Sequence, residues 1–196
     1  MDNIANWLTT HIKNNVPGLT HLQLIKIKFG IQCLLCEASK IIIYLVIFSF
    51  LSLTKEFIIS LLFFAVIRGF AGGYHEDTYW RCFTTSFLIL LSSIYLGMYL
   101  NLTMLAKSAI LFASMGLVYL LAPVDHPNKP ILSHERRKRL KYLSIIAVLV
   151  LGTVALSLPD IYSNVAVIAI FAESLSLLAG CIKKKYCITE KNNPPS

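Results

Sequence analysis

The two residues best suited to covalent chemistry in this sequence are His75 and Cys82, which stand seven positions apart. A cysteine attacks as its thiolate, and a neighbouring imidazole can take the thiol proton and later protonate a leaving amine. Arg81, directly before Cys82, adds a positive charge that favours the thiolate. On one continuous helix, however, residues seven apart share a face but lie about 10.5 Å apart along the axis, whereas proton transfer needs contact of about 3 Å. Either the chain bends between them, or Cys82 is a small apolar residue at a helix start and His75 an interfacial polar residue.

The segment that carries this pair, residues 68–82, differs sharply from its apolar surroundings. It begins with Arg68 and contains Gly72-Gly73 three residues before His75. Glycine permits positive backbone φ angles and close approach of two backbones. Non-helical backbone near a membrane persists only where protein or water satisfies its polar groups. We therefore predict that loop 68–82 is a re-entrant or interfacial turn built for a function.

The elements that must position this loop are apolar helices. The chain has 196 residues, of which 56% are hydrophobic and only 14% charged, and its mean hydropathy is +0.68. A soluble domain carries about a quarter charged residues, and a disordered chain still more, so both classes are excluded. Five cysteines are too few, and odd in number, for a secreted disulfide scaffold. The composition predicts an all-α, polytopic transmembrane helical bundle.

Uncharged runs divide the chain into three parts. Residues 1–30 are predicted to form amphipathic interfacial helices, broken near residues 14–18, with a capping box at Thr20 and Gln23; packing of these helices on the rest of the protein remains an alternative. Residues 31–182 are predicted to form a six-span domain, and residues 183–196 a basic, disordered tail. A span needs about 20 residues, so the first two short runs must be extended. The six predicted spans are 41–54 (extended back to Ile31), 57–67 (extended past Arg68), 82–106, 108–124, 142–159 and 161–182, the last with Glu173 as its only charge.

The cations predict how the spans are oriented. Of the 18 Lys and Arg residues, all but Lys55 and Lys107 fall on one side of a six-span arrangement. Positive residues accumulate on the cytoplasmic side of membrane proteins. We therefore expect both termini, loop 68–82 and the basic loop 123–142 to face the cytoplasm. This distribution also explains the net charge of +8 without a nucleic-acid partner.

Arg68, Gly72-Gly73-x-His75 and Cys82, taken together, resemble the signature of AgrB, the accessory gene regulator B proteins of Gram-positive bacteria. The chain length, the spans and the basic loop are similar too, over most of the sequence. The resemblance implies a membrane cysteine endopeptidase of peptide quorum sensing, with Cys82 as nucleophile and His75 as general base and acid. Arg68, Gly72 and Gly73 are implied to support the site.

The resemblance also implies the substrate. The enzyme would remove the C-terminal tail of an AgrD-type propeptide and hold the new C-terminus as a Cys82 thioester. A Cys or Ser of the peptide would then displace the enzyme and close a cyclic lactone or thiolactone autoinducing peptide. No cofactor is implied. For assembly the resemblance points to a homodimer, although the residues themselves leave the oligomeric state open.

Two further roles concern charged residues on the predicted inner face. The departing tail is acidic in this family, and a cluster of cations would attract it: Lys129, Arg136, Arg137, Lys138 and Arg139. The same cluster could instead serve topology and bind lipid headgroups. Asp125, which closely follows Pro123, is one candidate for an acid that orients the imidazole.

Two other functional classes compete with the peptidase. Glu173 is the only charge in the last span, and an intramembrane carboxylate is costly unless it is paired or functional. It could pair with Asn101, hold a dimer together, or line the path of a transporter or permease subunit. A lipid-modifying transferase using Asp125, His126 and His134 with a metal is the second rival. We expect no metal site, because the Cys33/Cys36 pair has no second pair at zinc spacing and the zincin pattern is missing.

Overall fold

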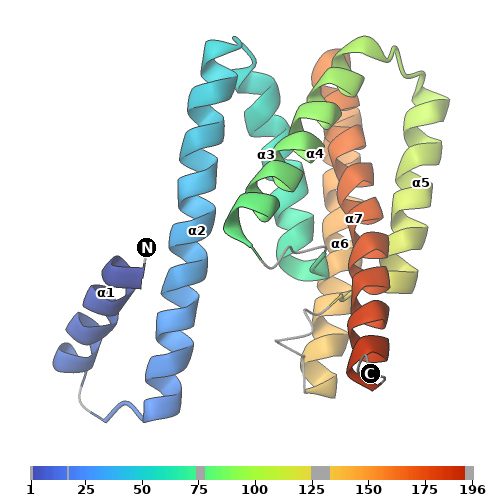
Figure 1. Cartoon of the computed structure of the whole chain (residues 1–196). Coiled ribbons are helices and arrows are strands. Elements are labelled where there is room, and N and C mark those ends of the chain that lie inside the picture. The colour runs from blue at the N-terminus through green and yellow to red at the C-terminus, as the bar shows by residue number, and fades with distance from the viewer. Residues whose placement is uncertain (1, 17, 74–77, 125–132, 193–196) are drawn as a thin grey trace. The chain divides into compact units, whose positions relative to one another are not determined.

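The computed structural model describes residues 2–16, 18–73, 78–124 and 133–192, and within them the chain forms seven helices (Figure 1). They are α1 (Asp2–Asn15), α2 (His21–Phe50), α3 (Thr54–Ala71), α4 (Tyr79–Tyr99), α5 (Met104–Leu121), α6 (His134–Ser157) and α7 (Asp160–Asn192). The chain divides into two compact units, Met1–Ser52 and Leu53–Ser196. The all-α fold predicted from composition is confirmed.

The first unit is the pair α1 and α2, which contact each other. The predicted capping box begins α2, since Thr20 Oγ1 accepts from the Gln23 amide at 3.3 Å and Gln23 Oε1 accepts from the Thr20 amide at 2.8 Å. Residues 21–30, the second half of the segment predicted to be interfacial, form the opening turns of α2, which continues unbroken to Phe50. Lys40 and Glu37 form an ion pair of 2.7 Å within this helix, so the two charges in its middle neutralise each other.

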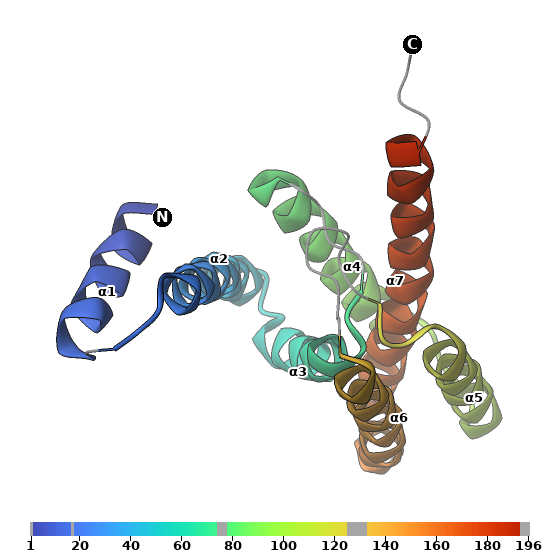
Figure 2. The ribbon, with the colours of Figure 1, turned by 90° about the horizontal axis from the view of Figure 1, so that it is seen from below.

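The second unit is built around α7, which contacts each of α3, α4, α5 and α6 (Figure 2). Six consecutive residues of α7, Val165 to Ile170, are each at most 8% exposed. Consecutive residues point around the whole circumference of a helix, so neighbours must surround α7 on every side. Because α7 contacts the other four helices of this unit, it is the central helix against which they pack.

Small and polar residues bring these helices close together, as is usual for helices that pack within a membrane. A Cβ atom on Gly97 of α4 would stand 2.6 Å from the Val165 Cα, which leaves room only for glycine. At the same crossing the Asn164 side-chain amide donates to the Leu100 carbonyl at 2.8 Å. At the start of α7, Lys107 lies 3.3 Å from Asp160.

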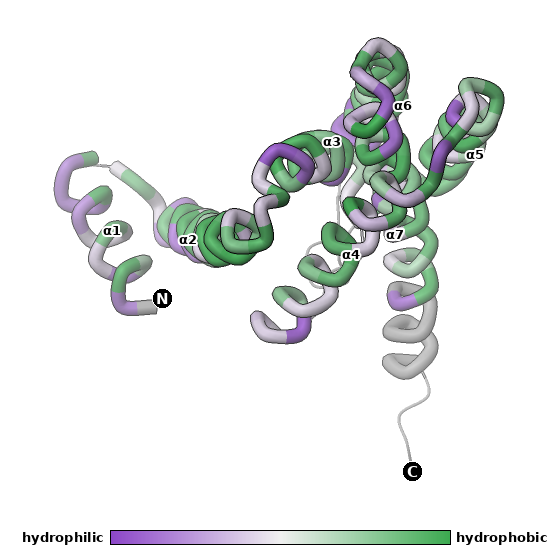
Figure 3. Tube along the Cα trace, turned by 90° about the horizontal axis from the view of Figure 1, so that it is seen from above, coloured by the Kyte–Doolittle hydropathy of each residue, from purple (hydrophilic) through white to green (hydrophobic). Residues whose placement is uncertain are grey.

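Large apolar side chains are exposed on the outside of this unit, and apolar residues make up most of α5 (Figure 3). Leu105, Phe112 and Leu120 of α5 are 83%, 80% and 76% exposed, which suits contact with lipid. Five helices, α2, α4, α5, α6 and α7, are long and apolar enough to cross a membrane. The remaining predicted span corresponds to α3, whose 18 residues include Lys55, Glu56 and Arg68. The chain is a multi-pass membrane protein.

Candidate functional site

Loop 68–82 begins with a glycine turn at the end of α3. The Gly72 amide donates to the Arg68 carbonyl at 3.0 Å, which closes the last turn of the helix. Gly72 has φ +76° and Gly73 φ +149°, a region that disfavours residues with a Cβ atom. A Cβ on Gly72 would also overlap the Val124 carbonyl oxygen. The glycine pair is therefore required both by its backbone angles and by the close approach of another segment.

That other segment is the start of the basic loop 123–142. The Val124 amide donates to the Ala71 carbonyl at 2.9 Å, and Gly72 and Val124 form an isolated parallel bridge. Next to it, Arg137 Nη2 donates to the Pro123 carbonyl at 3.4 Å. The structure thus brings together, side by side, the two loops that the sequence singled out separately.

Beneath the glycine turn lies a polar cluster on α7. Arg68 Nη1 donates to Glu173 Oε2 at 3.3 Å, and the Glu173 side chain is fully buried. A Cβ on Gly73 would lie 2.7 Å from Glu173 Oε1 and 2.8 Å from Ser176 Oγ. Among the described residues Glu173 is therefore paired and covered, whereas a residue that lines a water-filled path would be exposed to it.

The sequence analysis did not connect Glu173 with Arg68, and named Asn101 or a second copy as its partner. A signal for the true partner was present in the pattern of charges. Arg68 ends one otherwise uncharged run and Glu173 is the only charge in another, and two opposite charges among apolar spans stabilise each other when they meet. The sequence alone did not show that α3 and α7 pack together.

Cys82 lies in the first turns of α4 and is only 8% exposed. Its amide donates to the Thr78 carbonyl at 3.0 Å. The amides of residues 79–81 precede this bond and have no acceptor within the helix, as at any helix N-terminus, and the Thr78 side chain does not cap them. Trp80, in contrast, is 68% exposed, as suits an aromatic residue at a membrane interface. The buried Cys82 residue thus lies in the same helical turns as the backbone amides that begin α4.

Three predicted site residues, His75, Asp125 and Lys129, lie outside the described residues. The predicted contact between His75 and Cys82 therefore stays a prediction, as does the role of Asp125. What the structure describes is the two ends of the loop: Gly73 on the α7 surface and Cys82 at the start of α4.

The remaining predicted cations stand on the first turns of α6. Arg136, Arg137, Lys138 and Arg139 are all exposed, and only Glu135 is acidic there. The N-terminal end of a helix carries partial positive charge, so cations in its first turns are unfavourable for the helix itself. Arg136, Lys138 and Arg139 therefore do not stabilise α6 by their charge, and their exposed side chains can meet an anionic partner.

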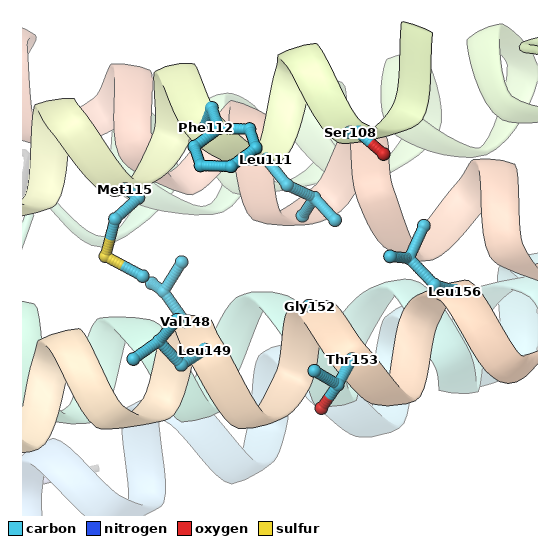
Figure 4. Close-up of a pocket in the computed structure, with 9 residues that line it drawn as sticks. All are labelled: Ser108, Leu111, Phe112, Met115, Val148, Leu149, Gly152, Thr153 and Leu156. Atoms are coloured by element: carbon cyan, nitrogen blue, oxygen red, sulfur yellow. The ribbon is translucent and has the colours of Figure 1, made fainter. Parts of the chain in front are cut away.

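An apolar groove between α5 and α6 is the other concave feature of note (Figure 4). Its lining includes Leu111 and Met115 from α5 and Val148 and Gly152 from α6, and no ionisable side chain. It contains neither Cys82 nor the glycine turn. The groove therefore offers no ionisable group for acid or base chemistry, and the candidate site is the one around loop 68–82.

Comparison with known proteins agrees with the resemblance seen in the motif. The sequence model of the family described as accessory gene regulator B matches residues 1–177. The chain is 27% identical to accessory gene regulator protein B of Staphylococcus aureus strain Newman over 179 residues, which cover 90% of this chain and 93% of the relative. It is 28% identical over 164 residues to an AgrB-like protein of Clostridium acetobutylicum, covering 82% of this chain and 76% of that protein. No solved structure matches. The chain belongs to the accessory gene regulator B family.

Proposed function

We propose that this protein is a membrane-embedded cysteine endopeptidase that matures an AgrD-type propeptide into a cyclic signal peptide. His75 takes the Cys82 thiol proton, and the thiolate attacks the carbonyl carbon of the scissile bond. The imidazolium then protonates the departing amine, which releases the C-terminal tail and leaves a thioester on Cys82. A Cys or Ser of the peptide attacks that thioester, closes a thiolactone or lactone ring and frees the Cys82 thiol.

The observation that carries this proposal is the burial of the Cys82 thiol in the first turns of α4. Transfer of the acyl group to the peptide, rather than to water, requires a site that water enters poorly, and Cys82 is 8% exposed. The amides of the first turn of α4, which point out of the start of the helix, are suitable donors for the oxyanion that forms when the carbonyl is attacked. Cyclisation is then favoured over hydrolysis.

The cations of α6 supply the part of the site that recognises the substrate. Arg136, Lys138 and Arg139 are exposed, while Arg137 reaches the Pro123 carbonyl at 3.4 Å, next to the Val124 bridge. An acidic propeptide tail held by these side chains would lie close to the glycine turn. With the cations on the cytoplasmic side, the propeptide would be cut on the face where it is made.

The test is a mass assay of propeptide processing in reconstituted vesicles. We expect the wild-type protein to release the C-terminal tail and to carry a thioester adduct on Cys82. Cys82→Ala and His75→Ala should lose tail release, because the first lacks the nucleophile and the second lacks the base. The helical circular dichroism spectrum should be unchanged in both.

The other cysteines provide matched controls for Cys82→Ala. Cys33 and Cys181 form no disulfide within the described part of the chain, and Cys33→Ala and Cys181→Ala should keep processing. If Cys82→Ala still releases the tail, Cys82 is only a residue at the start of a span and the proposal fails.

A further inference from the structure

Glu173 is a buried carboxylate that the proposed mechanism does not use. It lies in the middle of α7 and is 0% exposed. Charged groups within a span are rare because they are costly, and those that persist are paired or serve a function. The pairing of Glu173 explains only half of its side chain: Oε2 accepts from Arg68 at 3.3 Å, while Oε1 has no hydrogen-bond partner among the described residues.

The unpaired oxygen points at the glycine turn. A Cβ atom on Gly73 would lie 2.7 Å from Glu173 Oε1, 2.8 Å from Ser176 Oγ and 3.2 Å from Arg68 Nη1. Ser176 is 5% exposed and its hydroxyl, like Oε1, has no partner among the described residues. One acceptor and one hydroxyl, both buried, therefore face the backbone at the entrance to loop 68–82.

The next turn of α7 contacts the same piece of backbone. A Cβ on Gly180 would stand 3.1 Å from the Gly73 carbonyl carbon and 3.0 Å from a Val124 methyl group. Residues 173, 176 and 180 recur at helical spacing and share one face. This face of α7 thus packs against the glycine turn. Of the three positions, 173 and 176 carry side chains that can form hydrogen bonds.

A merely structural ion pair does not account for this arrangement. A buried pair stabilises a fold only when the remaining lone pairs are also satisfied. Here a carboxylate oxygen and a hydroxyl are left over, and both face the loop that carries the catalytic residues. Fixing a loop through its backbone is how a residue without contact to substrate can hold reacting groups in place.

We propose that Glu173 is a positioning residue for the reaction at Cys82, and that Ser176 assists it. Glu173 fixes the end of α3 through Arg68, and its Oε1 and the Ser176 hydroxyl pack against Gly73 at the entrance to loop 68–82. This inference rests on the proposed cysteine endopeptidase function. It adds to that function a pair of residues on α7 which neither touch substrate nor take part in proton transfer.

The test measures the single-turnover rate of Cys82 thioester formation in vesicles, together with the affinity for the propeptide. Glu173→Gln keeps the shape of the side chain but removes its charge and one acceptor oxygen. We expect its acylation rate to fall by about tenfold to a hundredfold, with propeptide affinity within about twofold of wild type. Glu173→Asp should recover part of the rate because it restores the carboxylate. A purely structural role would instead lower the folded fraction and leave the rate per folded molecule unchanged.

Matched controls come from the same helix. Ser174 is fully buried like Ser176, but its hydroxyl donates to the Ile170 carbonyl at 2.8 Å. Ser176→Ala should slow acylation while Ser174→Ala should not, and this comparison decides the matter even if Glu173→Gln does not fold. Asp160→Asn, which removes the acid at the start of α7, should have no effect on the acylation rate.

The outcomes separate this inference from the function on which it rests. If the wild-type protein forms no thioester, the endopeptidase proposal fails. If the wild type reacts and Cys82→Ala does not, but Glu173→Gln and Ser176→Ala both react at the wild-type rate, the positioning role of Glu173 is wrong.

Discussion

At the level of single residues, position 73 accepts only glycine. Its φ of +149° disfavours any side chain, and the space where a Cβ would go is filled by oxygens of Glu173 and Ser176. Backbone strain and steric overlap therefore act together at this position. The same arguments do not apply to Gly69, four residues earlier on α3, where a Cβ would meet nothing within 4 Å.

Gly73→Ala should therefore disable processing, whereas Gly69→Ala should preserve it. A residue forced into an unfavourable backbone region costs about 1–3 kcal/mol, and the added methyl group must also displace the Glu173 or Ser176 side chain. We expect the rate of tail release to fall at least about tenfold, because about 1.4 kcal/mol corresponds to a factor of ten. The mass assay checks this, and an active Gly73→Ala would contradict the described turn.

The residues of the site differ in how far the sequence could predict them. Cys82 and the glycine pair could be identified from residue type, because a thiol and two glycines in a polar segment between apolar runs are unusual. The partner of Glu173 could not, since 105 positions separate it from Arg68 and no local pattern joins them. The contact of His75 with Cys82 depends on a bend in loop 68–82, and spacing alone leaves that bend undecided.

At the level of elements, the most informative feature is the charge at the start of α6. Arg136, Lys138 and Arg139 are exposed in its first turns, where the helix dipole disfavours cations. Ser133 caps this helix by accepting from the Arg136 amide at 3.4 Å. The cap stabilises a helix end that its own charges destabilise, which suggests that the charges serve a binding role.

Neutralising these cations should weaken propeptide binding more than it slows chemistry. In the triple variant Arg136→Gln, Lys138→Gln, Arg139→Gln we expect the KM for a propeptide with an acidic tail to rise roughly tenfold, since each exposed charge pair contributes up to about 1 kcal/mol. The kcat should change little. Raising the salt concentration should lessen the difference from wild type.

Two controls accompany this variant: a propeptide without acidic residues in its tail, and a substitution of a cation far from α6 in the sequence. A propeptide whose tail acids are changed to amides should be processed with similar KM by the variant and the wild type. Lys26→Gln, at an exposed cation of α2, should leave KM unchanged. An equal rise in KM for both propeptides would assign the cations of α6 to topology or lipid headgroups.

Helix boundaries show what sequence patterns can and cannot predict. The Thr20 capping box was predicted correctly because capping depends on residues three apart. The continuity of α2 from residue 21 to residue 50 could not be predicted, because Lys26 and Lys28 interrupt the apolar pattern without interrupting the helix. Long cationic side chains can extend toward a polar interface while their helix continues, so charge alone does not mark a helix end.

At the level of the whole molecule, the second unit has two polar ends. One end has the Lys107–Asp160 pair at 3.3 Å. The other has the glycine turn, the Val124 bridge and the basic turns of α6. The distribution of cations predicts that this second end faces the cytoplasm.

Labelling of single cysteines with a membrane-impermeant maleimide tests this orientation. In a cysteine-free background, Lys138→Cys at the start of α6 should react only in inverted vesicles or permeabilised cells. Lys55→Cys at the start of α3 should react in intact cells. Both positions are exposed, so a failure to react reports the side of the membrane rather than burial. Labelling of Lys138→Cys in intact cells would reverse the predicted orientation.

The bond from the Val124 amide to the Ala71 carbonyl, 2.9 Å long, makes the two loops of the site thermodynamically linked. A ligand that binds loop 123–142 and shifts Val124 must also alter the conformational equilibrium of the glycine turn. By reciprocity, the state of that turn must change the ligand's affinity by the same factor. For the proposed endopeptidase, binding of a peptide tail and readiness for cleavage would then be a single coupled equilibrium, and departure of the tail would reset both loops together.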